Sequence, residues 1–461
     1  MTSRNFREFF LALTRWHEWN FIVPLVLVPV FYIFISGSNA VHPLLFSITT
    51  FWSFSCCAVF TFLINDFSDR EVDLKAHKVK PTASLSKVVI LSILLFTIIG
   101  GIAPIFFLAN FIIADATPIY LLLLCYVIGY LYSMPPVRLK ERAALGVFAA
   151  NLLPSIFLTG VILLVTSFDI ALMLFFIKLY LFNVRKLIQH QLVDFFNDKR
   201  TNVSTIVHNL GIGRVNFLLY KILMPIELLI STAILIVISA MNIKLMLLLL
   251  GFGFILVVHW SLMKRYNIIN ISPVESYMDD YFSLFLPFAL LFLLIERDLK
   301  NVLLLVMYIL IVRREVWQKY IDDIIILKDH FSLRRPDSIK TPPYDKETIK
   351  RILEKLPQNI MIRKDIEKYQ SYHFTDLDLF WHIKVENKKM YASYIPFSKS
   401  EYMLKMKFIN FHDVMVGKTN PVKLQYAGEV EIVGAPSNPL QSLDFIRYLS
   451  LAYKKTLHSF S

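Results

Sequence analysis

Three carboxylates stand at regular intervals in the run from Asn65 to Asp73, directly after an apolar segment. Asp66, Asp69 and Asp73 are spaced i, i+3 and i+7, so a continuing helix would place them on one face, about a turn apart. Like charges so placed repel one another and need a positive partner. Carboxylate oxygens suit Mg²⁺ that carries a phosphate-bearing substrate. The alternative interpretation is a solvated loop at a membrane interface.

A second acidic run, His190 to Arg200, follows another long apolar segment. Asp194 and Asp198 are i, i+4 partners at the end of that segment, with His190 one turn before Asp194. Carboxylates at such depths in a membrane are costly and usually functional. Two acidic clusters at one depth are what a pair of Mg²⁺ ions bridging a diphosphate requires.

The loop from Met134 to Arg142 presents cations at the same depth. Pro135 and Pro136 end the preceding helix, and Arg138 and Lys140 follow where they can bind an anion. Without the two acidic runs, these cations would be an ordinary topology signal.

The composition is that of a polytopic membrane protein. Of the 461 residues, 56% are hydrophobic, more than a soluble globule needs. Repeated apolar stretches are long enough to cross a hydrocarbon layer of ~30 Å. The predicted spans are 20–36, 44–64, 88–109, 117–133, 145–166, 168–192, 216–240, 243–260 and 280–295, with a shorter apolar run at 301–312.

The loops alternate in charge. The short loops carry almost no Lys or Arg, whereas the long loops at 65–87, 134–143, 193–214 and 261–279 carry many. The positive-inside rule therefore places the N-terminus and these long loops in the cytoplasm. The run at 301–312 is expected to cross as well, because Arg313 and Arg314 follow it. The alternative is that it lies in the membrane interface, which would leave the C-terminal part of the chain outside.

The remaining composition excludes other classes of protein. The net charge of +13 is explained by these topology determinants, so no nucleic-acid partner is expected. Cys56, Cys57 and Cys125 all lie in apolar segments and indicate neither disulfides nor a zinc site.

The three polar runs together resemble the motifs of the UbiA-type intramembrane prenyltransferases, over about residues 10–295. The first motif reads Asn65-Asp66-x-x-Asp69-Arg70-Glu71-x-Asp73, with Lys78, Lys80-Pro81 and Ser84 behind it. The loop motif reads Tyr132-Ser133-x-Pro135-x-x-Arg138-Leu139-Lys140. The second motif reads Asp194-x-x-x-Asp198-Lys199-Arg200 and continues through Thr205 to Leu210-Gly211.

This resemblance implies an all-α polytopic membrane bundle of nine core transmembrane helices, here with a short tenth. It also implies Mg²⁺-dependent transfer of a prenyl group from a prenyl diphosphate to a lipophilic acceptor. The implied metal ligands are Asn65, Asp66, Asp69, Asp73, Asp194 and Asp198, of which the aspartates are the catalytic set. The implied diphosphate-binding residues are Lys78, Lys80, Arg138, Lys140 and Arg200.

One departure from the family pattern keeps other functions open. Gln191 stands where family members commonly carry an acidic residue, which removes a charge from the second motif. A non-catalytic membrane protein that binds or transfers lipid is therefore an alternative. A terpene-cyclising or phosphoribosyl-transferring relative would use the same aspartates.

A third group of acids follows Arg265, at Glu275, Asp279 and Asp280. Acidic residues are favourable in the first turn of a helix, so we expect a solvated helix start here. A third acidic site is the alternative.

From Arg313 the composition shifts, and Lys, Asp and Glu become frequent. We expect a membrane domain at 1–313, a linker at 314–344 and a soluble α+β domain at 345–461. The spacing predicts a helix over 346–356, and apolar alternation predicts strands near 377–385 and 402–408. His373, His382 and His412 lie near carboxylates in sequence only and make no catalytic constellation.

The end of this domain resembles the sterol carrier protein type of lipid-binding domain. The resemblance rests on the turn Gly417-Lys418-x-x-Pro421, the strand Gly428-x-x-x-Ile432-x-Gly434 and an apolar helix near 443–451. It implies a hydrophobic tunnel that holds a lipid, and membrane lipids as partners. The expected crossing at 301–312 would place this domain on the cytoplasmic side. A small α+β domain with an ordinary core is the alternative.

Overall fold

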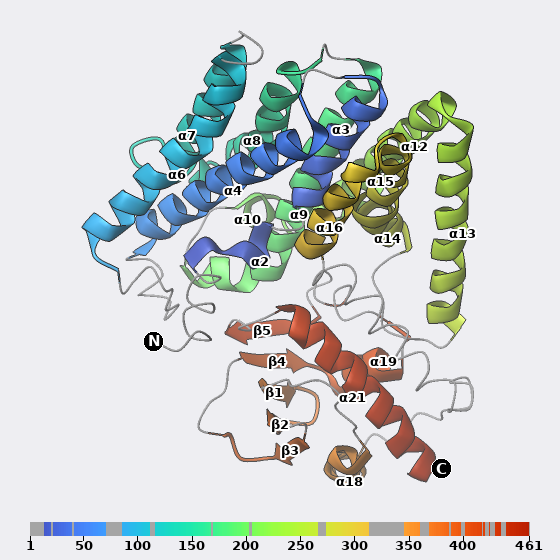
Figure 1. The fold of residues 1–461 in the computed structure, drawn as a ribbon. Helices are drawn as coiled ribbons and strands as arrows, with labels where there is room; N and C mark the ends of the chain where they lie inside the picture. The colour runs from blue at the N-terminus through green and yellow to red at the C-terminus, as the bar shows by residue number, and fades with distance from the viewer. Residues whose placement is uncertain are drawn as a thin grey trace. The chain divides into compact units, whose positions relative to one another are not determined.

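The computed structural model describes residues 13–19, 22–38, 41–70, 85–110, 116–166, 169–201, 205–265, 273–312, 345–359, 368–386, 389–397, 402–416, 418–419, 424, 429–434 and 439–460. The chain divides into two compact units (Figure 1). The helical unit comprises residues 1–191, 201–254 and 274–318, and the C-terminal unit comprises residues 192–200, 255–273 and 319–461 and contains the sheet. We describe each unit by itself.

Helices account for nearly all of the described chain before residue 313. In order they are α2 (Trp16–Trp19), α3 (Val23–Ile35), α4 (Pro43–Ser68), α6 (Lys87–Leu108), α7 (Thr117–Ser133), η4 (Leu139–Glu141), α8 (Ala143–Leu163), α9 (Ile170–Thr201), α10 (Ile206–Leu210), α11 (Ile212–Phe217), η5 (Leu218–Leu223), α12 (Met224–Met241), α13 (Ile243–Arg265), α14 (Pro273–Asp280), η6 (Tyr281–Phe285), α15 (Leu286–Arg297), η7 (Leu299–Asn301) and α16 (Val302–Val312). Every predicted span falls on one of these helices or on a helical series that continues through η segments.

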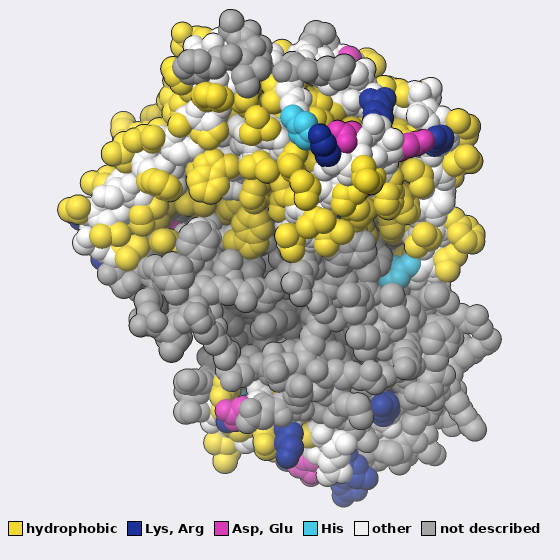
Figure 2. Space-filling view, in the orientation of Figure 1, with side chains coloured by type: hydrophobic (Ala, Val, Ile, Leu, Met, Phe, Trp, Pro, Cys, Tyr) yellow, Lys and Arg dark blue, Asp and Glu magenta, His cyan; other side chains and the backbone are white. Residues whose placement is uncertain are grey.

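Six described helical stretches are long and apolar enough to cross a membrane. Three shorter apolar helices, Val23–Ile35, Thr117–Ser133 and Leu299–Val312, accompany them. Large hydrophobic side chains lie on the outside of these helices, such as Phe96 on α6, which is 63% exposed, and Phe254 on α13, which is 70% exposed. Figure 2 shows such side chains gathered over the helical unit. The protein is therefore an integral membrane protein, and the number of its spans stays a prediction.

Local sequence sets where these helices begin. The His42 ring accepts a hydrogen bond from the Leu44 amide, and Pro43 follows at the first helical position of α4. Ser86 accepts from the Val89 amide and caps α6 in the same way.

Helix α4 packs against both α6 and α7, and small residues allow these close contacts. A Cβ added to Gly101 on α6 would collide with the Tyr126 hydroxyl of α7. That hydroxyl donates a hydrogen bond to the Thr97 carbonyl at 2.9 Å, so it cannot move freely. A Cβ at Gly129 on α7 would lie 3.0 Å from the Thr61 hydroxyl of α4.

The C-terminal unit contains an α+β fold, as predicted. Its elements are α18 (Lys346–Asn359), β1 (Lys368–Phe374), β2 (Leu379–Glu386), β3 (Lys389–Ser393), β4 (Tyr402–Met406), α19 (Phe408–Val416), β5 (Glu431–Gly434) and α21 (Pro439–Phe460). The sheet order is β3-β2-β1-β4-β5. β1 pairs antiparallel with β2, where Tyr372 faces Trp381, and parallel with β4, where Tyr372 faces Leu404.

One face of this sheet forms the core with the three helices. Trp381, Ile383 and Val385 alternate along β2 and are all at most 1% exposed. They belong to the same cluster as Phe411 of α19 and Tyr453 of α21. The alternation that predicted the strand thus reflects burial of every second side chain.

We predict that Gly101→Ala lowers the thermal stability of the protein, by about 1–3 kcal/mol of unfolding free energy, because the methyl group overpacks the α6–α7 contact. Gly251→Ala is the matched control, since no atom lies within 4 Å of the added methyl on α13. Thermal unfolding of the purified proteins in one detergent measures both. Equal unfolding midpoints for the two variants would contradict the proposed close packing.

Candidate active site

The first acidic motif lies where α4 ends. Asn65 and Asp66 occupy the last turn of the helix, which stops at Ser68. Asp69 is the C-cap residue, and its amide donates to the Asn65 carbonyl at 3.0 Å. Asp69 thus lies in a turn, and Arg70 after it is again helical; whether the three aspartates share one helical face stays a prediction. Asp73 lies beyond the described residues.

Two cations from the loop between α7 and α8 bind the polar groups of this helix end. The Lys140 ammonium donates to the Asn65 side-chain oxygen at 2.9 Å and also to the Asp69 carboxylate. Arg138 Nη2 donates to Asp69 Oδ1 at 2.9 Å. The sequence motifs that predicted an acidic site and a cationic loop at one depth are thus joined by direct contacts.

The loop that carries these cations has a tight backbone. Arg138 has a φ of +42°, in the left-handed region that residues other than glycine rarely adopt. A Cβ added to Gly146, on the first turn of α8, would lie 2.5 Å from the Leu139 carbonyl oxygen. Glycine at 146 therefore allows α8 to approach η4 closely enough to fix the position of Lys140.

Two serines join α4 to α7 at the same place. The Ser68 hydroxyl donates to the Ser133 carbonyl at 2.6 Å. The Ser133 hydroxyl donates to the Asn65 side-chain oxygen at 3.3 Å. These bonds hold the ends of α4 and α7 in register, so that Asn65 and Asp69 face the cationic loop.

Arg15 is a site residue that the sequence did not single out. Its Nη1 lies 2.8 Å from Asp66 Oδ1, and the Asp66 side chain is only 2% exposed. The guanidinium also stacks over the Phe62 ring, 4.9 Å from the centroid. A basic residue just before the first predicted span was the only signal available, and many membrane proteins carry one for topology alone.

The ion pair between Lys140 and Asp69 is partly exposed and can be broken by a ligand. Burial lowers the pKa of the Lys140 amine below its usual value, and the Asp69 carboxylate offsets part of this effect. The side chains of Lys140 and Asp69 are 14% and 20% exposed, so both can be reached by a ligand.

The donor set here suits a hard divalent cation. Asn65, Asp66 and Asp69 offer amide and carboxylate oxygens, the ligands that Mg²⁺ prefers, and one or two carboxylates suffice when a phosphate completes the shell. In the described part of the chain, no group of three or more His, Cys, Asp or Glu side chains gathers as a metal site. Protein oxygens from this motif alone would leave coordination positions open for a ligand.

The remaining predicted site residues are outside what the structure describes. Lys78 and Lys80 fall, like Asp73, in the stretch 71–84. Asp194, Asp198 and Arg200 lie on the backbone of α9, but their side chains are outside the described set. The proximity of the two acidic motifs stays a prediction.

One expectation is wrong. Asp279 does not belong to a solvated helix start, since its side chain is 20% exposed and pairs with Arg185 and Lys186 of α9. No motif or spacing indicated that α9 would bring Arg185 and Lys186 to this helix.

Comparison with known proteins identifies the class. The model of the UbiA prenyltransferase family matches residues 25–275, more than half of the chain. The protein belongs to the UbiA prenyltransferase family, and it is a prenyltransferase. No curated protein matches the sequence.

Solved structures with a similar fold are distant in sequence. A UbiA homologue from Archaeoglobus fulgidus, bound to GPP and Mg²⁺, is 19% identical, with a TM-score of 0.44 over 61% of this chain and 96% of that one. A UbiA homologue from Aeropyrum pernix K1 is 12% identical, with a TM-score of 0.40 over 59% of this chain and 95% of that one. At these values the likenesses carry no argument about the substrate of this chain.

We predict that Gly146→Ala slows prenyl transfer by about two orders of magnitude, because the displaced η4 segment carries Lys140 away from Asn65 and Asp69. Gly213→Ala, where the added methyl meets no atom within 4 Å, is the control and should keep its turnover. Turnover of a labelled prenyl diphosphate by both purified variants measures the effect. Full activity in Gly146→Ala would show that the loop position does not matter.

Proposed function

We propose that this protein transfers a prenyl group from a prenyl diphosphate to a lipophilic acceptor within the membrane, in a reaction that requires Mg²⁺. The observation that supports this most is the contact of Lys140 and Arg138 with Asp69. It combines metal-binding oxygens with phosphate-binding cations at one helix end, which is the pairing a metal diphosphate needs. The active-site loops would face the cytoplasm.

The ion pairs of the free protein would exchange when the substrate binds. In the free state, Lys140 and Arg138 neutralise Asp69, and Arg15 neutralises Asp66. Mg²⁺ bound with a diphosphate supplies positive charge to the carboxylates and makes the diphosphate a better leaving group. The released Lys140 and Arg138 can then donate to the phosphate oxygens. The carboxylates thereby keep a positive partner throughout.

The same groups would assist the chemistry. As the bond between the prenyl carbon and the diphosphate oxygen breaks, its electron pair leaves with the diphosphate, and Lys140 and Arg138 stabilise the growing negative charge. The apolar helices exclude water from the allylic cation, so that the acceptor forms the new bond to that carbon and gives up a proton, which the departed diphosphate can accept. We propose that Asp194, Asp198 and Arg200 complete the metal and diphosphate site from α9, with Asp73, Lys78 and Lys80 from the loop after α4.

The C-terminal α+β domain is proposed to hold a lipid for this reaction. A partly open cavity of about 390 Å³ lies between α18 and β3 of this domain and is lined by Glu354, Pro357, Trp381, Ala392, Ser393, Tyr394 and Ile395. The apolar side chains among them suit an acyl or prenyl chain. Tethering by a linker of ~30 residues would keep the carrier at roughly millimolar concentration near the membrane domain.

We predict that Asp66→Asn abolishes turnover, because the neutral amide loses both the charge that binds the metal and the pairing with Arg15. Chelation of Mg²⁺ should have the same effect on the wild type. The control is Glu296→Gln, which neutralises an exposed acid paired with Lys244 at the other end of the membrane helices. Mg²⁺-dependent product formation from a labelled prenyl diphosphate is the measurement, and normal turnover in Asp66→Asn would overturn the proposed site.

We predict that Ala392→Trp, which fills the cavity of the C-terminal domain, slows turnover when the acceptor is supplied in separate vesicles. Turnover should be unchanged when the acceptor is dissolved in the same detergent micelle. Phe380→Ala provides the control, because Phe380 is 39% exposed on β2 and does not line the cavity. Equal slowing under both conditions would contradict a carrier role.

A further inference from the structure

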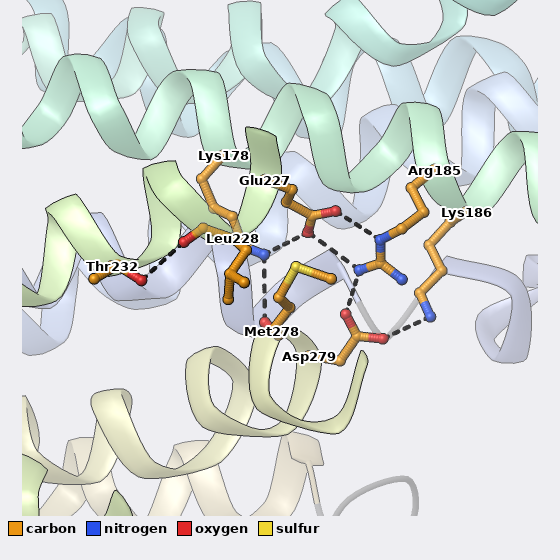
Figure 3. A network of polar contacts seen from close by, with 8 residues as sticks. All are labelled: Lys178, Arg185, Lys186, Glu227, Leu228, Thr232, Met278 and Asp279. Carbon is orange, nitrogen blue, oxygen red and sulfur yellow. Dashed lines mark hydrogen bonds and ion pairs between the residues drawn. The ribbon is translucent and has the colours of Figure 1, made fainter. Parts of the chain in front are cut away.

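A cluster of charged side chains lies inside the helical unit, apart from the α4 motif (Figure 3). Arg185 of α9 pairs with Glu227 of α12, at 2.6 Å between Nε and Oε2 and 3.1 Å between Nη2 and Oε1. The Lys178 ammonium donates to the same carboxylate and to the Met278 carbonyl. Asp279 of α14 accepts from Arg185 Nη2 and, at 2.7 Å, from Lys186 Nζ.

The cluster is buried at a position where ionised groups are energetically unfavourable. The side chains of Lys178, Arg185 and Glu227 are all at most 1% exposed. Ionised groups at such depth in a membrane protein are rare and mark ligand sites, ion paths or tight structural pairs. A purely structural set is expected to balance its charges and its hydrogen bonds, because each imbalance costs free energy.

This cluster balances neither its charges nor its hydrogen bonds. Its formal charges are three positive, on Lys178, Arg185 and Lys186, against two negative, on Glu227 and Asp279. When Lys178 is protonated, its ammonium donates to two oxygen acceptors and lies over the rings of Phe182 and Phe282. One positive charge is therefore left over.

The hydrogen bonds of Arg185 are also incomplete. Arg185 Nη1 is fully buried and has no partner among the described residues. In Figure 3 this nitrogen carries no dashed line and lies on the side of Lys186. A buried guanidinium N–H without an acceptor is unfavourable, so Nη1 is suited to donate to an oxygen that the described chain does not supply.

We propose that Arg185 Nη1 and Lys186 Nζ form a binding site for a single oxyanion, a phosphate or carboxylate, inside the helical unit. Such a group would neutralise the excess positive charge and accept from Nη1. Lys186 is 33% exposed and Asp279 is 20% exposed, so the ligand can enter on their side of the cluster. The oxyanion is either a free ion or the head group of a lipid lodged between the helices.

This site is distinct from the prenyl diphosphate site and does not depend on the proposed function. Arg185 precedes Asp194 by nine residues, about two and a half helical turns, so the two residues stand on different faces of α9. None of the cluster residues contacts the end of α4 in the described part of the chain.

Two substitutions with opposite expected effects test the proposal by equilibrium binding in Mg²⁺-free buffer. Lys186→Gln removes one of the two cations and should weaken binding about tenfold. Asp279→Asn removes the carboxylate that competes for them and should strengthen it about tenfold. The probes are inorganic phosphate with the protein in detergent, and phosphatidic acid in phosphatidylcholine nanodiscs. The first probe reports a free ion and the second a lipid head group.

The controls separate this site from other anion sites. Lys244→Gln removes an exposed lysine that is also paired with a carboxylate, and it should bind both probes like the wild type. Lys140→Gln should weaken only the binding of anions at the end of α4 and leave binding at the Arg185–Lys186 site unchanged. Opposite shifts in Lys186→Gln and Asp279→Asn with either probe support the site. Unchanged binding in both variants, or no binding of either probe to the wild type, overturns it and leaves a water molecule as the acceptor of Nη1.

Discussion

The candidate active site depends on cations that neutralise the negative charge at the end of α4. Asp66 is almost completely buried, and Asn65 and Asp69 lie beside it, so the helix end is stable only with cations in contact. Arg15, Arg138 and Lys140 supply them from two other parts of the chain. Because these contacts connect the N-terminal segment, α4 and the α7–α8 loop, the charges that prepare the site for a metal diphosphate also hold its elements together.

The helix packing follows from that constraint. Glycines at 101 and 129 bring α4, α6 and α7 close together, and Gly146 brings α8 against the loop that carries Lys140. A shift of α4 or of the start of α8 would move a cation away from its carboxylate. The charge cluster of α9, α12 and α14 extends the same principle to the rest of the helical unit, where Glu227 and Asp279 fix three helices through Lys178, Arg185 and Lys186.

Much of this arrangement was predictable from the sequence, because the signals were strong and local. Apolar length predicted the helices, two-residue alternation predicted β2 and β4, and the motifs around Asp66 and Lys140 predicted that these residues belong to one site. Contacts between distant segments were not predictable. Arg15 resembles a topology determinant, and Asp279 resembles a solvated helix start until Arg185 and Lys186 are placed beside it.

We propose that the end of α4 and the second acidic motif of α9 hold one metal diphosphate between them. Electron paramagnetic resonance of Mn²⁺, used in place of Mg²⁺, tests it directly by counting the ions bound in the presence of a prenyl diphosphate that cannot react. The account predicts that Asp69→Asn and Asp194→Asn each reduce this diphosphate-dependent binding. Undiminished binding in Asp194→Asn would contradict it, because the second motif would then take no part in holding the substrate.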